Sequence, residues 1–201
     1  MKKLNNRGFT LVEILAMMVI LVVLLAISVP NISGILSKQK ENISVDDANK
    51  LVESTKIKVR TKKNVELPTE DNNCNVYTMA FLDTNDDYFS GTNGGTYDKF
   101  ESFVVAKKVS RTVDGMKEVS YEYYVRLFED VDGETMGVEL TKAENIEKNP
   151  KNYMKTFDKK VGITKTANMS TVEANIAEIN SGLCNQIERI YVSSDVVINR
   201  Y

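Results

Sequence analysis

The longest apolar run of the chain covers residues 9–29, FTLVEILAMMVILVVLLAISV, and contains one charge, Glu13. A helix over this run would be roughly 30 Å long at about 1.5 Å per residue, which is the thickness of a bilayer core. All later segments mix polar and apolar positions. We therefore expect a membrane helix followed by a domain that this helix carries.

After residue 30 the pattern becomes amphipathic. Apolar side chains recur three to five positions apart, which is typical of a helix with one buried face; they include Ile32, Ile35, Leu36, Ile43, Ala48, Leu51, Val52 and Val59. Pro30 removes a backbone donor, and Ser44 would be able to cap a new helix. We favour one curved helix to about Lys62 over two segments that join near Ile43.

Residues 63–201 have the pattern of an α+β domain. Two long β-type runs flank Asp114-Gly115, and a third covers residues 131–140 through Asp132-Gly133, which predicts an antiparallel meander. Shorter strands are predicted over residues 75–82, 187–192 and 195–199, and a helix over 141–148. Residues 64–73, 83–97 and 151–169 have irregular, loop-like patterns. The capping box Ser170-Thr171-Val172-Glu173 predicts a second short helix, which would end before Gly182.

The hairpin around Asp114-Gly115 permits a prediction of its register, because the apolar residues of both arms fall on odd positions: Phe103, Val105, Val109, Val113, Val119, Tyr121, Tyr123, Val125 and Leu127. A two-residue loop would place the two apolar rows on opposite faces of the sheet. A three-residue loop with Gly115 in the left-handed conformation places them on one face. We therefore predict that Thr112 pairs with Met116 and that the shared row packs on the amphipathic helix, with Lys107 at an open edge.

The segment before the apolar run carries the most specific pattern. A basic leader, residues 1–8, ends in Gly8, and Arg7-Gly8-Phe9-Thr10-Leu11-Val12-Glu13 resembles the processing motif of type IV prepilins. In that family the leader is removed after the glycine on the cytoplasmic side. The new terminal Phe is then methylated, and a Glu at the fifth mature position is needed for assembly. The resemblance implies cleavage between Gly8 and Phe9, N-methylation of Phe9, and an assembly role for Glu13.

Pro30 also occupies a helix position at which this family has a proline. The resemblance covers residues 1–62 and implies a long N-terminal helix packed on an antiparallel β-sheet head, hence an α+β fold. The expected organisation is a prepilin leader at 1–8, a transmembrane and assembly helix at 9–30, its amphipathic continuation at 31–62, and an extracytoplasmic globular head at 63–201.

Glu13 needs an explanation, because a carboxylate near the middle of a membrane helix costs about 2.5–3.5 kcal/mol, and somewhat less near one end. One interpretation is that the side chain extends to the interface, although Glu is short for this. The other, which we favour, is that it meets the terminal ammonium of a neighbouring Phe9 in an assembled filament. At 4 Å and an effective dielectric constant near 20, such a pair gains roughly 4 kcal/mol before desolvation. It would fix the axial register of the subunits.

The function that the resemblance implies is that of a structural subunit of a type IV pilus, which supports surface adhesion, twitching motility or aggregation. Its partners would be other pilin subunits, prepilin peptidase and the assembly machinery in the membrane. It would begin as a single-pass precursor in the inner (cytoplasmic) membrane with its N-terminus in the cytoplasm, and end in an extracellular pilus. Two alternatives stay open: a pseudopilin of a type II secretion or DNA-uptake system, and a non-polymerising, membrane-anchored binding domain.

Composition excludes several other functions. The chain has no histidine, which removes Ser-His-Asp and Cys-His catalysis and His-containing metal sites. We expect neither an enzyme nor a cofactor. The net charge of −2, without a clustered basic excess, argues against nucleic acid as a partner.

Two features of the head are candidates for further chemistry. Cys74 and Cys184 are the only cysteines; extracytoplasmic placement and an even count favour a disulfide, and two free thiols are the alternative. Asp83, Asn85 and Asp87 have the spacing of the first calcium ligands of an EF-hand. However, Tyr88 and Gly94 stand where that loop has Gly and Glu. A solvated turn is favoured there, and calcium stays a weak candidate.

Overall fold

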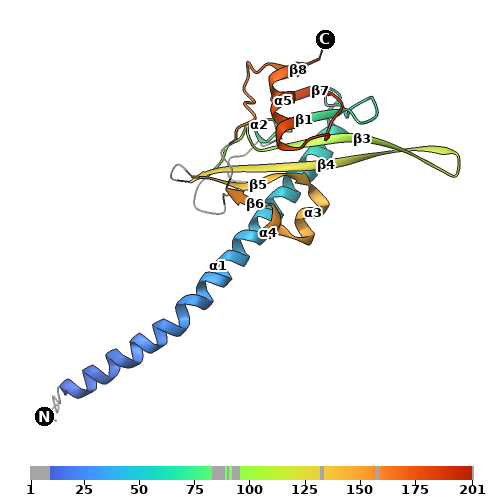
Figure 1. Ribbon diagram of the computed structural model, residues 1–201. Coiled ribbons are helices and arrows are strands. Elements are labelled where there is room, and N and C mark those ends of the chain that lie inside the picture. Colours follow the sequence, from blue (N-terminus) through green and yellow to red (C-terminus); the bar gives the residue numbers. More distant parts are fainter. Residues whose placement is uncertain are drawn as a thin grey trace, which may run out of the picture. The chain divides into compact units, whose positions relative to one another are not determined.

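The computed structural model describes residues 10–82, 89, 91, 96–131, 134–156 and 159–200, with the side chains of residues 26–34, 37, 131 and 134–136 excepted (Figure 1). Its elements are α1 (Leu11–Thr61), β1 (Cys74–Thr78), α2 (Met79–Leu82), β2 (Thr96–Tyr97), β3 (Phe103–Val113), β4 (Met116–Val131), β5 (Glu134–Lys142), α3 (Ala143–Lys148), α4 (Pro150–Tyr153), β6 (Met154–Thr156), α5 (Met169–Ile179), β7 (Ile187–Ser193) and β8 (Val196–Asn199). The chain divides into two compact units, Met1–Gln39 and Lys40–Tyr201, which are described separately.

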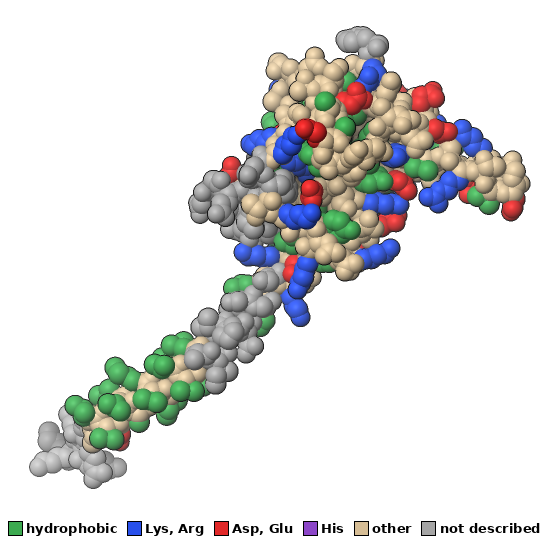
Figure 2. All heavy atoms as spheres, in the orientation of Figure 1, with side chains coloured by type: hydrophobic (Ala, Val, Ile, Leu, Met, Phe, Trp, Pro, Cys, Tyr) green, Lys and Arg blue, Asp and Glu red, His purple; other side chains and the backbone are tan. Residues whose placement is uncertain are grey.

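The first unit contains the N-terminal part of α1. Its large apolar side chains from Leu11 to Leu25 are all exposed, by 48% to 81%, and Figure 2 shows them as a run of hydrophobic atoms. As secondary structure, α1 passes Pro30 and Ile43 without interruption, so the prediction of one helix agrees with the structure. Among the described residues, no helix combines the length and the apolar character needed to cross a membrane.

The second unit is built on a mixed sheet. Over the described residues this sheet has eight strands in the order β6-β5-β4-β3-β1-β7-β8, and β2 pairs with β4. Strands β3, β4 and β5 form the predicted antiparallel meander, and β6, which we did not predict, pairs antiparallel with β5. However, β1 pairs with β7 in parallel. The prediction of an antiparallel sheet was therefore wrong at this pair. The meander and α5 separate β1 from β7 in sequence, and such a long connection allows the last hairpin to join β1 in parallel.

Both faces of this sheet are covered. On one face Ala48, Leu51 and Val52 of α1 lie in a core cluster with sheet residues such as Tyr77, Val104 and Leu127. On the other face Val172 and Ile176 of α5 lie in a second cluster with residues such as Val76, Phe103 and Ile190. β1 is consequently buried at all five of its positions, as expected for a strand between two layers.

The register of the β3–β4 hairpin corrects our prediction. Val113 pairs with Met116, not Thr112 with Met116. The two-residue loop has φ values of +50° at Asp114 and +79° at Gly115. Left-handed conformation at both loop positions is the geometry of a type I′ turn, which Asp-Gly favours and which matches the twist of the strands.

The prediction failed because it assumed one buried face. With the observed register the two odd rows lie on opposite faces of the sheet: Val105 belongs to the cluster beneath α5, whereas Val125 belongs to the cluster beneath α1. The even residues Val104 and Ala106 complete the α1 face. Lys107 is half-buried, between Cys74 of β1 and Glu122 of β4.

Three smaller predictions also need correction. The strand predicted over 75–82 ends at Thr78 and continues as α2, and residues 151–169 hold most of α4 and all of β6. The N-cap of α5 is Asn168, whose side chain accepts hydrogen bonds from the Ser170 and Thr171 N–H groups. The predicted capping box does not form, because the Glu173 carboxylate instead accepts from Ile187 N and Arg200.

Candidate functional site

Several residues that the sequence singled out lie outside the described part of the chain: Gly8, Phe9, Asp83, Asn85 and Asp87. Pro30 lies within α1, and its side chain is not described. Among the described residues no group of three or more His, Cys, Asp or Glu side chains is placed to hold a metal ion.

Glu13 lies at the N-terminus of α1 and forms a capping box with Thr10. The Thr10 backbone N–H and hydroxyl donate to Oε2 of Glu13 at 2.8 Å and 2.9 Å. The Glu13 backbone N–H donates in return to Oγ1 of Thr10 at 3.3 Å. This reciprocal arrangement satisfies N–H groups that have no partner within the helix. The sequence carries its signature, Thr-x-x-Glu, which our sequence analysis missed.

The capping box determines which oxygen of the Glu13 carboxylate is left for other contacts. Both hydrogen bonds to the carboxylate end on Oε2, so the box does not use Oε1. The neighbouring side chains are apolar and exposed: Leu11 by 81%, Val12 by 73% and Ile14 by 48%. The site is therefore a fixed carboxylate at the end of an apolar helix surface, which suits docking against other apolar helices and a cation.

Comparison with known proteins identifies a family motif in the N-terminal segment of the chain. Residues 3–29 match the family model described as the prokaryotic N-terminal methylation motif. The chain thus carries the class III leader of type IV pilins and pseudopilins. Neither the curated proteins nor the solved structures include a match to this chain.

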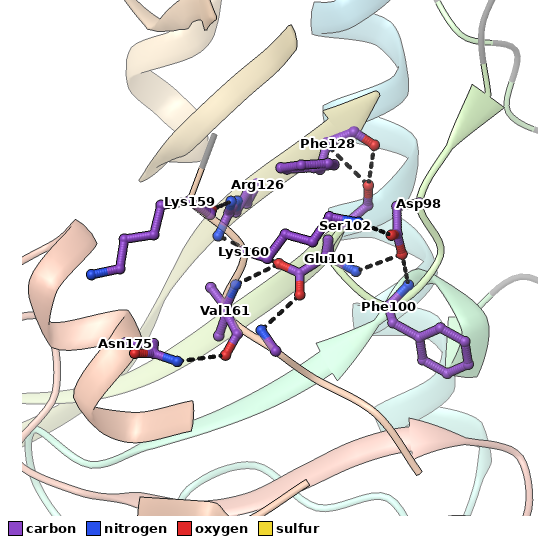
Figure 3. Close-up of polar contacts among 11 residues, drawn as sticks. Asp98, Phe100, Glu101, Ser102, Arg126, Phe128, Lys159, Lys160, Val161 and Asn175 are labelled. Carbon is purple, nitrogen blue, oxygen red and sulfur yellow. Dashed lines mark hydrogen bonds and ion pairs between the residues drawn. The ribbon is translucent and has the colours of Figure 1, made fainter. Parts of the chain in front are cut away.

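The head contains a second polar site, around Glu101 and Arg126, which Figure 3 shows. These side chains are 3% and 1% exposed, and Arg126 Nη1 lies 3.8 Å from Glu101 Oε2. The two carboxylate oxygens of Glu101 accept the Val161 and Gly162 N–H groups, each at 2.7 Å. Burial lowers the pKa of Arg126, and the charge of Glu101 opposes that shift.

The contacts around this pair identify it as a structural clamp. Arg126 donates to the Lys159 carbonyl, and Asn175 of α5 donates to the Val161 carbonyl at 2.9 Å. Residues 159–162 are thus held between the sheet and α5 (Figure 3). Because Glu101 already accepts two backbone N–H groups, the arrangement suits packing rather than acid–base chemistry. No local sequence pattern indicates this cluster.

Cys74 and Cys184 are joined by a disulfide, with 5.7 Å between their Cα atoms. Cys74 begins β1 and is fully buried, and Cys184 lies between α5 and β7. The bond therefore connects the loop after α1 to the segment after the last helix, as the sequence analysis expected.

Proposed function

We propose that this chain is a structural subunit of a type IV pilus, processed between Gly8 and Phe9 and assembled through α1. The match of residues 3–29 to the methylation motif carries the proposal. Two structural facts support it: the apolar side chains from Leu11 to Leu25 are exposed, and Glu13 is held at the start of the same helix.

In this proposal the apolar helix serves two states in turn. In the precursor it lies in the membrane as a single-pass anchor, with the leader in the cytoplasm, where prepilin peptidase removes it. In the pilus the same surface packs against the helices of other subunits. Lipid tails and protein side chains are similarly apolar, so the transfer never exposes this surface to water, and close packing supplies the adhesion.

Glu13 would then set the register of neighbouring subunits. Its Oε2 stays in the capping box, while Oε1 accepts the terminal ammonium of a neighbouring Phe9. Such a pair gains roughly 4 kcal/mol before desolvation. A single buried polar contact of this kind fixes alignment rather than driving association, as a buried polar residue does in coiled coils.

Two substitutions separate the charge of Glu13 from its capping role. Glu13→Gln keeps a side chain that can complete a capping box but removes the charge, and Glu13→Ala removes both. We expect both variants to be cleaved normally and to enter filaments at least about tenfold less than wild type. Thr10→Ala, which keeps the charge, is expected to assemble. Wild-type incorporation of Glu13→Gln would show that the charge is not the determinant.

The experiment is a filament preparation probed for this chain, with N-terminal sequencing of the band. We expect a sequence that starts at methylated Phe9. A cleaved chain that never appears in surface filaments would favour a pseudopilin, and an uncleaved chain would favour an anchored binding domain. We propose no catalytic role and no cofactor; roles in adhesion, twitching motility or aggregation follow only if the filaments form.

A further inference from the structure

The contact between α1 and β2 contains a carboxylate that is buried almost completely. Asp47 lies on the buried face of α1, one turn before Leu51, and is 2% exposed. Tyr97 of β2 is 6% exposed and belongs to the same core cluster as Leu51. β2 has only two residues, pairs with β4, and leaves its other side chain, Thr96, exposed. The packing of β2 on α1 therefore depends on the Tyr97 side chain.

The polar atoms at this contact are incompletely satisfied. Oδ1 of Asp47 accepts a hydrogen bond from the Lys50 ammonium at 3.1 Å, and the Lys50 side chain is 44% exposed. The Tyr97 hydroxyl faces Asp47 and Ser44 of α1. Nevertheless, neither Oδ2 of Asp47 nor the Tyr97 hydroxyl completes a hydrogen bond in the part of the chain that the structure describes. A charged carboxylate is costly in this position, because it has lost its hydration and gained few contacts.

The charges around Asp47 do not remove this cost. The titratable groups that act on the contact, among the described residues, are Asp46 and Lys50 of α1, Tyr97 of β2 and Glu129 of β4. Burial raises the pKa of Asp47 above its ordinary value, and the hydrogen bond and charge of Lys50 only partly oppose this shift. Burial and the charges of Asp47 and Glu129 raise the pKa of Tyr97, so its hydroxyl stays protonated at physiological pH.

The protonation state of Asp47 changes what this contact can form. A neutral Asp47 has an O–H that can donate to the Tyr97 hydroxyl oxygen, and it does not need hydration. An ionised Asp47 regains water only when β2 moves away from α1. A carboxyl group whose pKa is raised in the closed state stabilises that state below its ordinary pKa, about 3.9, and this contribution is lost as the pH rises through the raised value.

We propose that Asp47 and Tyr97 form an acid-strengthened latch between α1 and β2. In acid the neutral carboxyl group of Asp47 holds the Tyr97 side chain on α1. As the pH rises, the buried charge favours a local opening in which β2 leaves α1 and its short pairing with β4 breaks, while the rest of the sheet stays folded. The latch lies within the head and does not depend on assembly of the chain into filaments.

Amide hydrogen exchange, measured by NMR on the full chain in detergent micelles, tests the latch. The reporter is the Asp98 backbone N–H, which follows β2 directly and donates to the Phe128 carbonyl at 2.8 Å. After correction for the intrinsic pH dependence of exchange, its opening constant should rise about threefold or more from about pH 4 to about pH 8. Asp47→Asn, which is neutral at every pH, should abolish this rise. Asp46→Asn removes the exposed neighbouring carboxylate and should retain it.

Titration of Asp47 itself provides a second test that does not depend on how Asp47→Asn folds. The carbon-13 signal of its carboxyl group should titrate above the ordinary range of Asp in the wild-type chain. Lys50→Gln removes the cation that donates to Asp47, so it should move both this titration and the rise in opening to higher pH. A wild-type opening constant that is independent of pH, a rise that persists in Asp47→Asn, or titration of Asp47 at or below its ordinary pKa would overturn the proposal.

Discussion

At the scale of single residues, Glu188 of β7 shows how one carboxylate holds a loop on the head. It accepts hydrogen bonds from the Thr69 and Glu70 N–H groups, each at 2.9 Å, and from the Asn73 side chain at 3.1 Å. Burial raises the pKa of Glu188, but the hydrogen bonds from Glu70, Thr69 and Asn73 outweigh it, so the pKa lies below its ordinary value.

This shift predicts a pH dependence of stability. A lowered folded-state pKa means that Glu188 stabilises the fold above its unfolded pKa, about 4.3, and that this contribution disappears as the pH falls through the folded value. Glu188→Gln should therefore lower the free energy of unfolding by about 1–2 kcal/mol at pH 7. Urea unfolding should show that the gap to wild type closes in strong acid. Glu144→Gln, at an exposed carboxylate, is the control; a gap that is independent of pH would contradict the argument.

The roles of some residues can be predicted from local sequence patterns, and those of others cannot. The capping box of Glu13 was present in the sequence as Thr-x-x-Glu, because its partners are three residues apart. The clamp of Glu101 was not, because its partners at Val161 and Gly162 are about 60 residues away and contribute only backbone N–H groups. Sequence patterns report local hydrogen bonds and say little about a carboxylate that binds distant backbone.

At the scale of elements, the existence of the strands was easier to predict than their pairing. Asp114-Gly115 correctly predicted a hairpin, and its own turn preference indicated the two-residue loop that forms. The odd–even argument for the register of the hairpin was wrong because it assumes that one face of the sheet is polar. Both faces of this sheet carry apolar clusters. Short elements such as α4 and β6 were missed, because segments of three or four residues are too short to show a period.

Two glycines of the meander should respond differently to a methyl group. Gly137 of β5, at φ +149°, would place a Cβ only 2.0 Å from the Leu127 carbonyl oxygen, whereas Gly115 in the turn, at φ +79°, has nothing within 4 Å. Gly137→Ala must displace backbone, so we expect it to lower the free energy of unfolding by about 3 kcal/mol or more. Gly115→Ala should cost only about 1–2 kcal/mol for its left-handed conformation. Urea unfolding of both variants measures the difference, and equal losses would contradict the observed packing of β5 on β4.

At the scale of the whole molecule, the sequence indicated an α+β chain with an N-terminal helix but not the order of the strands. The leader and its helix are continuous in sequence, so residues 3–29 alone suffice for the family motif. The parallel pairing of β1 with β7 joins segments more than 100 residues apart, such as Val76 and Ile190. Only the packing of the whole head selects this pairing, and the disulfide beside it covalently fixes the same two regions.

That disulfide should be the largest single covalent contribution to the stability of the head. Cys74 and Cys184 are 110 residues apart, so the bond restricts a long loop of the unfolded chain. The chain-entropy model gives about 4–5 kcal/mol for a loop of this length. We therefore expect the double variant Cys74→Ala, Cys184→Ala to melt roughly 8–20 °C below wild type, at about 2–4 °C per kcal/mol for a chain of this size. Thermal unfolding of the oxidised protein, the reduced protein and the double variant provides the measurement, and the last two should agree closely. Two thiols open to alkylation without reductant, or an unchanged melting temperature, would show that the bond does not form or does not stabilise the head.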